Sequence, residues 1–223
     1  MTHFETEVLK HFELQREVAQ TARALNTEGL TYGYSGNVSV RHPNGRGLLI
    51  TPSALPYNNL NIDEIPLLGW DGAYKRGAPP SSEWRLHLAI AKACPDAAAI
   101  VHCHSPHATA LACSRKGIPS FHYMVGFCGG DSIRCTRYAP PGSDELSDIV
   151  VEALEGRLAC LMGNHGQVAI GKDLPAALYL AGLVEELARI YCATFAIGGP
   201  ALLSETQMEE TIAIFATYGQ KKT

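Results

Sequence analysis

Two histidines separated by one residue, His102 and His104, have the residue types and the spacing of a metal site. They end an apolar run, and residues 99–104 are predicted to form a buried strand. Side chains two apart on a strand point to the same face, so both imidazoles should emerge side by side. A catalytic zinc keeps three protein ligands and one exchangeable position, and neutral imidazole is a common ligand. The pair alone fits two histidines that bind no metal equally well.

A third histidine, His165, lies in the turn formed by residues 163–166, between Gly163 and Gly166. Small residues on both sides let the backbone bend and let a metal approach. A solvated histidine would fit the same turn. His107 and His122 are competing candidates that spacing does not exclude, although His107 falls in the next expected helix, off the strand face.

The run Ser81-Ser82-Glu83 is expected to begin a helix over residues 83–93, with Ser82 as its cap. Free N–H groups at a helix start and two hydroxyls suit an anion. Glu83 can point toward the same centre, and a carboxylate beside a metal can act as general acid or base. Residues 31–37 add backbone and amide donors, without the glycine spacing of nucleotide-binding loops. An ordinary N-cap and an ordinary turn would produce the same two patterns.

The elements that must position these groups are helices interleaved with strands. Apolar residues at helical spacing predict a first helix over residues 4–28. Asn44-Gly45 and Asp71-Gly72 indicate hairpins, which favour a mixed or largely antiparallel sheet. With no linker or repeat, one α/β domain over residues 1–223 is expected. Further strands are expected over residues 38–41, 48–51, 67–70, 73–74, 158–162 and 167–170, and further helices over 107–115, 174–196 and 208–218.

Composition narrows the function classes. The chain has 223 residues, of which 46% are hydrophobic and 18% charged, as in soluble globular proteins. A net charge of −4 without a basic run argues against a nucleic-acid partner. Neither a membrane span nor a secretory signal is expected. The seven cysteines are irregularly spaced and form no CxxC pair, so reduced thiols and a cytoplasmic location are expected.

Seven short segments occur in one order along nearly the whole chain: residues 36–41, 50–54, 80–84, 102–104, 122–124, 164–166 and 217–219. Together they resemble the class II aldolase and adducin family, especially its fuculose-1-phosphate aldolase branch. Their joint occurrence is far more specific than any one motif. The resemblance implies a single-domain α/β/α sandwich with a central, mostly antiparallel sheet. It also implies a homotetramer with active sites at subunit interfaces.

The resemblance further implies a role for each matching residue. His102, His104 and His165 would bind one Zn²⁺ per chain, with Mn²⁺ or Co²⁺ as other possible metals. Glu83 would be both the resting fourth ligand and the acid/base. Tyr123 and Tyr218 would lie near the aldehyde end. The phosphate and carbonyl site would be lined by Gly36, Asn37, Ser53, Ala54, Ser81 and Ser82.

By the same resemblance, the expected reaction is cleavage of a ketose 1-phosphate to dihydroxyacetone phosphate and an aldehyde. The candidate substrates are of the fuculose, rhamnulose, 5-deoxyribulose and 5-methylthioribulose 1-phosphate type. Alternatives within the family are a pentulose-phosphate 4-epimerase, a methylthioribulose-1-phosphate dehydratase and an oxo-acid phosphate decarboxylase. A non-enzymatic adducin-like module is a further alternative, against which the three histidines and Glu83 argue.

The sequence departs from the fuculose-specific pattern in two places. Ser53-Ala54 stands where Thr-Gly is usual, and Pro141 stands where an aromatic residue is expected near the aldehyde. The phosphate end is therefore largely kept and the aldehyde end altered. Aldehyde preference is expected to depend on the surface around Pro141, Tyr123, Phe215 and Tyr218.

Overall fold

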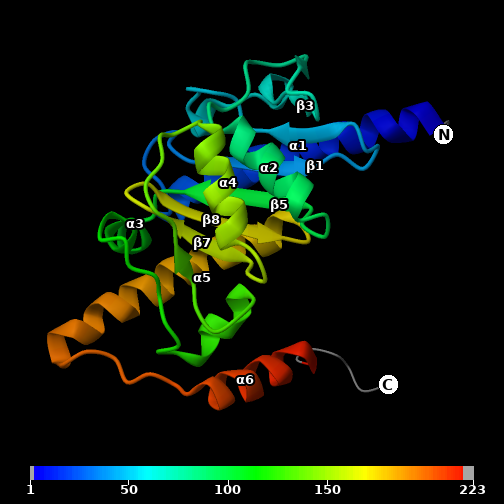
Figure 1. The fold of residues 1–223 in the computed structure, drawn as a ribbon. Helices are drawn as coiled ribbons and strands as arrows, with labels where there is room; N and C mark the ends of the chain where they lie inside the picture. Colours follow the sequence, from blue (N-terminus) through cyan, green and yellow to red (C-terminus); the bar gives the residue numbers. More distant parts are fainter. Residues whose placement is uncertain (1–2, 218–223) are drawn as a thin grey trace.

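The computed structural model describes residues 3–217, which contain one eight-stranded sheet in the order β4-β3-β2-β1-β5-β8-β7-β6 (Figure 1). Neighbouring strands are antiparallel except β6 and β7, which are parallel. The prediction of a mixed, mostly antiparallel sheet is confirmed. The strands are β1 (Asn37–Arg41), β2 (Gly47–Ile50), β3 (Leu67–Gly69), β4 (Tyr74–Lys75), β5 (Ala99–Cys103), β6 (Arg134–Cys135), β7 (Ala159–Met162) and β8 (Gly166–Gly171).

Helices cover both faces of the sheet and give the expected α/β/α layers (Figure 1). The helices α1 (His3–Thr27), α3 (Pro106–Cys113) and α5 (Leu174–Thr194) share one apolar cluster with one face. The helices α2 (Trp84–Ala93) and α4 (Asp144–Ala153) share a second cluster with the other face. None of the described helices is long and apolar enough to cross a membrane.

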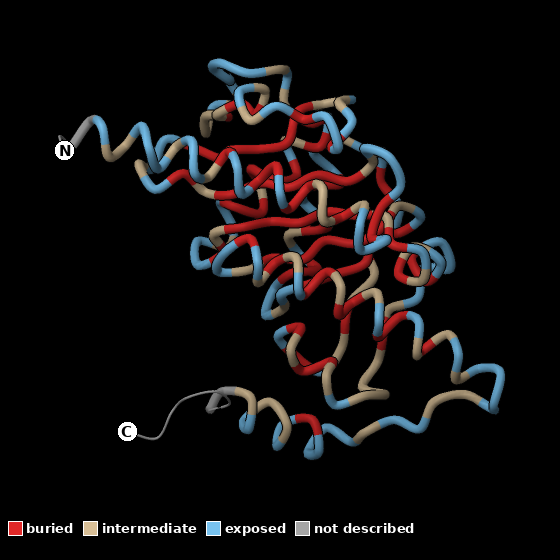
Figure 2. Tube along the Cα trace, turned by 180° about the vertical axis from the view of Figure 1, so that it is seen from behind, coloured by how far each residue is buried: buried red, intermediate tan, exposed pale blue. Residues whose placement is uncertain are grey.

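Strand β5 lies in the middle of the sheet and is buried along its whole length, as Figure 2 shows for the central strands. Val101 and Cys103 belong to the apolar cluster under α1, α3 and α5, and Ile100 to the cluster under α2 and α4. Alternation of side chains between the two faces explains this division. His102 therefore faces the α2 side, near the end of a fully buried strand.

Helix α4 and strand β6 were not predicted. The signal for α4 was present: Ser143 accepts a hydrogen bond from the Leu146 N–H, and Asp144 and Glu145 fill the first turn. Acidic residues at a helix start are favourable because they complement the helix dipole. Strand β6 has only two residues and pairs in parallel with β7, a non-local pairing that short-range patterns do not reveal.

The last helix, α6 (Glu205–Thr217), begins earlier than predicted and lies apart from the sheet (Figure 1). It packs against a 3-10 segment, η3 (Tyr123–Cys128), through Phe127 and Phe215, whose ring centroids are 3.9 Å apart. Tyr218 lies outside the described residues.

Candidate metal centre and substrate pocket

The three histidines predicted as metal ligands form one cluster where β5 ends. The ring centroids of His102 and His104 are 4.8 Å apart. The ring centroid of His165 lies 4.8 Å from that of His102 and 5.1 Å from that of His104. One ligand atom from each residue lies within 4.8 Å of the others. The Nε2 atoms of His102 and His104 approach to 3.0 Å. Nitrogens from the pair His102 and His104 and from the sequence-distant His165 thus converge on one point.

A hydrogen bond fixes the orientation of the His102 ring. Its Nδ1 lies 2.9 Å from the backbone oxygen of Gln167, which can only accept, so Nδ1 carries the proton. The lone pair on Nε2 then faces the cluster. A metal-binding histidine usually donates its second ring nitrogen in this way.

The turn that carries His165 packs tightly against the end of β5. Asn164 has φ of 57°, in the left-handed region. A Cβ on Gly166 would lie 2.5 Å from the Cys103 oxygen, so only glycine allows this approach. Nδ1 of His165 is buried and has no hydrogen-bond partner among the described residues. A buried nitrogen without a partner is costly unless something binds it.

The cluster suits a divalent metal. Burial lowers the pKa of all three imidazoles. The pKa of His102 falls well below its usual value. The pKa of His165 falls to about 4, and the neighbouring His104 contributes to this fall. The rings are therefore neutral at neutral pH, as metal binding requires. Together with the unpartnered Nδ1 of His165, the donor set fits zinc or a related ion.

Glu83 lines the same pocket, outside the group of three histidines. It is 5% exposed, and its Oε2 atom is buried without a hydrogen-bond partner among the described residues. Burial raises the pKa of its carboxyl, and a hydrogen bond from the Gly142 backbone opposes this rise only in part. A carboxyl group in this state is suited to taking up and releasing a proton.

The start of α2 differs from the prediction. The helix begins at Trp84, with Glu83 at the capping position and no capping by Ser82. Ser81 instead satisfies two N–H groups: its Oγ accepts from Glu83 and its backbone oxygen from Trp84. These two N–H groups are not free to bind an anion, because they already donate hydrogen bonds to Ser81. The hydroxyls of Ser81 and Ser82 remain available as donors.

The pocket has a volume of about 550 Å³ and contains all six predicted substrate-binding residues. Sequence reasoning missed Tyr34, Ser35 and Asn164, although each lies in a turn that it singled out. It also missed Tyr138, which lines the pocket. Pro141, three residues later, lines the pocket as expected. The lining is Tyr34, Ser35, Gly36, Asn37, Pro52, Ser53, Ala54, Ser81, Ser82, Glu83, His102, His104, Tyr138, Pro141, Asn164 and His165.

Strand β1 brings the Gly-rich loop against the metal cluster, because Asn37 pairs directly with His102. Gly36 has φ of 91°, and a Cβ there would lie 2.8 Å from the His102 oxygen. The hydroxyl of Tyr57 donates a hydrogen bond to the Gly36 backbone oxygen, at 2.5 Å. The loop is therefore held at a distance from β5 that only glycine permits.

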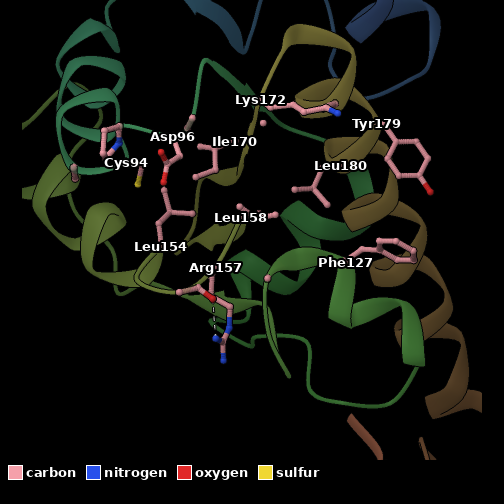
Figure 3. A pocket seen from close by; sticks show the side chains of 17 residues that line it. Cys94, Asp96, Phe127, Leu154, Arg157, Leu158, Ile170, Lys172, Tyr179 and Leu180 are labelled. Atoms are coloured by element: carbon pink, nitrogen blue, oxygen red, sulfur yellow. Dashed lines mark hydrogen bonds between the residues drawn. The ribbon is translucent and has the colours of Figure 1, made fainter. Parts of the chain in front are cut away.

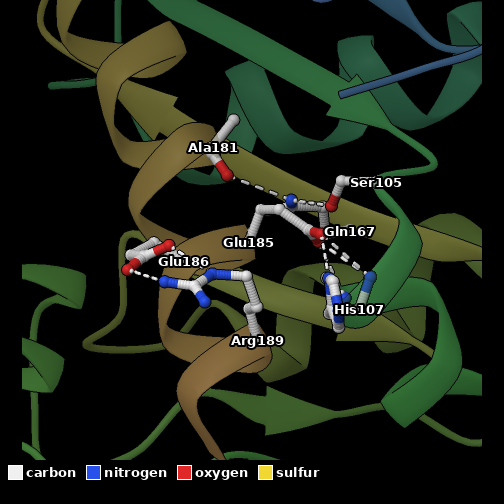
Figure 4. A network of polar contacts seen from close by, with 8 residues as sticks. Ser105, His107, Gln167, Ala181, Glu185, Glu186 and Arg189 are labelled. Atoms are coloured by element: carbon white, nitrogen blue, oxygen red, sulfur yellow. Dashed lines mark hydrogen bonds and ion pairs between the residues drawn. The ribbon is translucent and has the colours of Figure 1, made fainter. Parts of the chain in front are cut away.

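The competing histidines lie elsewhere. Glu185 accepts hydrogen bonds from the Nδ1 and the backbone N–H of His107, and a further one from Ala108, so His107 belongs to the start of α3 (Figure 4). The same view shows the Gln167 side chain joining Ser105 to Ala181, which ties the end of β5 to α5. His122 accepts from the Met124 N–H.

Tyr123 is not brought into the pocket within one chain. It is 51% exposed and stacks on His122, and its ring centroid lies 6.1 Å from that of Phe215. Phe215 packs on Phe127 and likewise does not line the pocket. The aldehyde-end tyrosines therefore remain predictions.

A larger hollow of about 800 Å³ lies at the opposite ends of the central strands (Figure 3). It is lined mostly by apolar groups such as Leu154, Leu158 and Leu180, with Lys172 and Arg157 at its edges. It contains none of the predicted site residues. Size alone would select this hollow, but it lacks the converging polar groups that the predicted chemistry requires.

Known proteins resemble this chain in sequence and in fold. A 5-methylthioribulose-1-phosphate/5-deoxyribulose-1-phosphate aldolase from Rhodospirillum rubrum is 44% identical over 206 residues, 92% of each chain. An L-fuculose phosphate aldolase from Escherichia coli is 41% identical over 208 residues, 93% of this chain and 96% of that one. The solved structure of an L-fuculose 1-phosphate aldolase superposes with a TM-score of 0.88 and 34% identity, covering 92% of this chain and 96% of the other.

The family model described as the class II aldolase and adducin N-terminal domain matches residues 16–192. This range contains the three histidines, Glu83 and all six predicted substrate-binding residues. It ends within α5 and leaves out α6. The chain belongs to the class II aldolase and adducin family.

Proposed function

We propose that this protein is a zinc-dependent class II aldolase that cleaves a ketose 1-phosphate to dihydroxyacetone phosphate and an aldehyde. One observation carries the proposal. Three neutral imidazoles share a pocket with hydroxyl and amide donors and with the buried Glu83 carboxyl, whose Oε2 has no hydrogen-bond partner among the described residues. Such a pocket offers charge stabilisation, proton transfer and anion binding within one small volume.

The residues divide these tasks. His102, His104 and His165 would hold the metal, with Glu83 as a resting fourth ligand. When bound, the metal supplies positive charge that stabilises negative charge developing on the substrate oxygens as the carbon–carbon bond breaks. Glu83 would transfer the proton at the reacting carbon, a task to which its raised pKa is suited.

The wall of the pocket that carries the hydroxyl and amide donors would bind the phosphate. Ser81 and Ser82 offer hydroxyl donors, and Asn37 offers an amide beside the Gly36 backbone. Ser53 and Ala54 complete this wall, and Ala54 has φ of 56°, a conformation that favours the glycine usual at this position. A phosphate bound here would leave the carbonyl end of the substrate next to the histidines.

The tyrosine side would be completed by another subunit. Tyr123 is half exposed and outside the pocket of its own chain. A homotetramer with active sites at subunit interfaces, as the family resemblance implies, would let a neighbour supply this group.

All seven cysteines are free thiols, which agrees with a reducing cytoplasm.

The test is a panel of fuculose, 5-deoxyribulose and 5-methylthioribulose 1-phosphates, which are the substrate types named for the relatives. The zinc-loaded protein is assayed for dihydroxyacetone phosphate, with the unphosphorylated ketoses as controls. Release from at least one phosphorylated ketose supports the proposal. No release from any of them with zinc bound would overturn it. Product analysis then separates cleavage from epimerisation, dehydration and decarboxylation.

A further inference from the structure

One buried polar side chain next to the pocket has no part in the proposed reaction. His87 lies on α2 one helical turn after Glu83 and is completely buried. It is neither in the histidine cluster nor in the lining of the pocket. A fully buried imidazole must be hydrogen-bonded to be tolerated, so its partners indicate what it does.

Its two ring nitrogens contact two residues of β1. Nδ1 lies 2.7 Å from the Ser39 hydroxyl, and Nε2 lies 2.5 Å from Oδ1 of Asn37. Asn37 and Ser39 are two positions apart on the strand, so both face α2. The imidazole therefore links the interior of the sheet to a residue of the pocket.

Hydrogen-bond satisfaction decides where the ring proton lies. Burial lowers the pKa of His87 to about 3, so the ring is neutral and has one donor and one acceptor nitrogen. Ser39 is fully buried, and its hydroxyl has no other partner among the described residues. The hydroxyl must therefore donate to Nδ1, and Nε2–H donates to Oδ1 of Asn37. The other tautomer would leave the Ser39 proton buried without an acceptor, which is unfavourable.

This arrangement determines which end of the Asn37 amide faces the pocket. Its oxygen is occupied by His87, so its NH₂ group is the end left for a ligand. A flipped amide would instead present an oxygen to the anion. We propose that His87 is a positioning residue that holds the Asn37 amide with its NH₂ group toward the pocket, so that an anion bound there meets a donor. Only the identity of that anion as a substrate phosphate rests on the proposed function.

The first test measures the affinity of the zinc-loaded protein for inorganic phosphate by calorimetry. His87→Met removes both ring nitrogens, and we expect phosphate binding to weaken about ten- to hundredfold, the range for losing one hydrogen bond to a charged group. His87→Gln should restore most of the affinity, because its amide nitrogen can donate to Asn37 from nearly the same place. Leu88→Met, a buried change on the same helix, is the matched control and should bind like the wild type.

The second test asks whether His87 acts through Asn37. Asn37→Ala should weaken phosphate binding, and His87→Met should add nothing further in that background. Ser39→Ala is a milder change that frees the ring to adopt the other tautomer, and it should weaken binding in the same direction even if His87→Met does not fold.

Wild-type phosphate affinity in Ser39→Ala and in a folded His87→Met protein would overturn the proposal. A full additional loss from His87→Met in the Asn37→Ala background would also overturn it, since His87 would then act on general stability. These phosphate measurements require no turnover. Failure of the proposed aldolase reaction therefore appears separately, as absence of dihydroxyacetone phosphate release by the wild type.

Discussion

The two sides of the pocket differ in how completely one chain builds them. On the metal and phosphate side, Asn37, Ser81, Glu83 and His102 are each at most 5% exposed. On the other side, Tyr138 is 47% exposed and Tyr123 is 51% exposed, outside the pocket. The first set lies on or next to strands and α2, the second on loops and η3.

This difference indicates where chemistry and selectivity reside. Oε2 of Glu83 and Nδ1 of His165 are buried without hydrogen-bond partners among the described residues, so a bound ligand would satisfy them. Loop residues open to solvent tolerate change and can be completed by a neighbouring subunit. Substitutions of the buried metal-binding and proton-transfer groups should therefore abolish the reaction, whereas those on the exposed tyrosine side should change which aldehyde is preferred.

The largest effect is expected from removing a histidine of the metal cluster. His102→Ala should lower zinc affinity by more than the roughly 10–100-fold seen when a partner of a metal ligand is lost, and activity should fall with it. The measurement is zinc per chain after gel filtration. His107→Ala, which alters a histidine bonded to Glu185, is the control and should retain zinc. Undiminished zinc in His102→Ala would contradict the ligand assignment.

The next effect concerns proton transfer. Glu83→Gln preserves the shape of the side chain and removes its charge, so the fold should persist. We expect kcat to fall by about 10²–10⁴-fold, the usual contribution of a positioned acid or base. Single-turnover and steady-state rates are compared on protein with confirmed zinc content. Near-normal turnover with metal bound would exclude Glu83 as the acid/base.

A smaller effect is expected on the phosphate wall. Ser82→Ala removes one donor from an exposed position and should raise KM for phosphorylated ketoses by about tenfold, with little change in kcat. KM for the corresponding unphosphorylated ketose, where measurable, should not change. If the wild type used both kinds of ketose equally well, the pocket would not be selecting for phosphate.

The exposed side should affect only the preference among substrates, not whether the reaction occurs. Pro141 lines the pocket where an aromatic wall is expected, and proline fixes its own backbone angle. The values of kcat/KM for the three ketose phosphates should differ by no more than about 10–200-fold, because one methylene in an apolar pocket is worth only about 1–3 kcal/mol. A preference for fuculose 1-phosphate above roughly a thousandfold would show that the Pro141 departure is neutral.

The sequence was sufficient for most of the fold. Short apolar runs located the central strands, and Asn44-Gly45 and Asp71-Gly72 indicated the hairpins that make the sheet mostly antiparallel. It missed α4, whose signal at Ser143 was present, and β6, whose signal was absent. Strand β6 exists only through its pairing with β7, which is distant in the sequence, so no local pattern contains it.

For the site, the sequence by itself determined the residue types: a histidine pair two apart on a strand, a third between glycines, and a carboxyl after two serines. Only the tertiary structure brought His165 to His102 and placed Asn37 opposite His102. It also assigned the His102 proton and directed the Ser81 oxygens to N–H groups at the start of α2. These features depend on strand register and burial, because non-local pairing sets which donors and acceptors remain unpartnered.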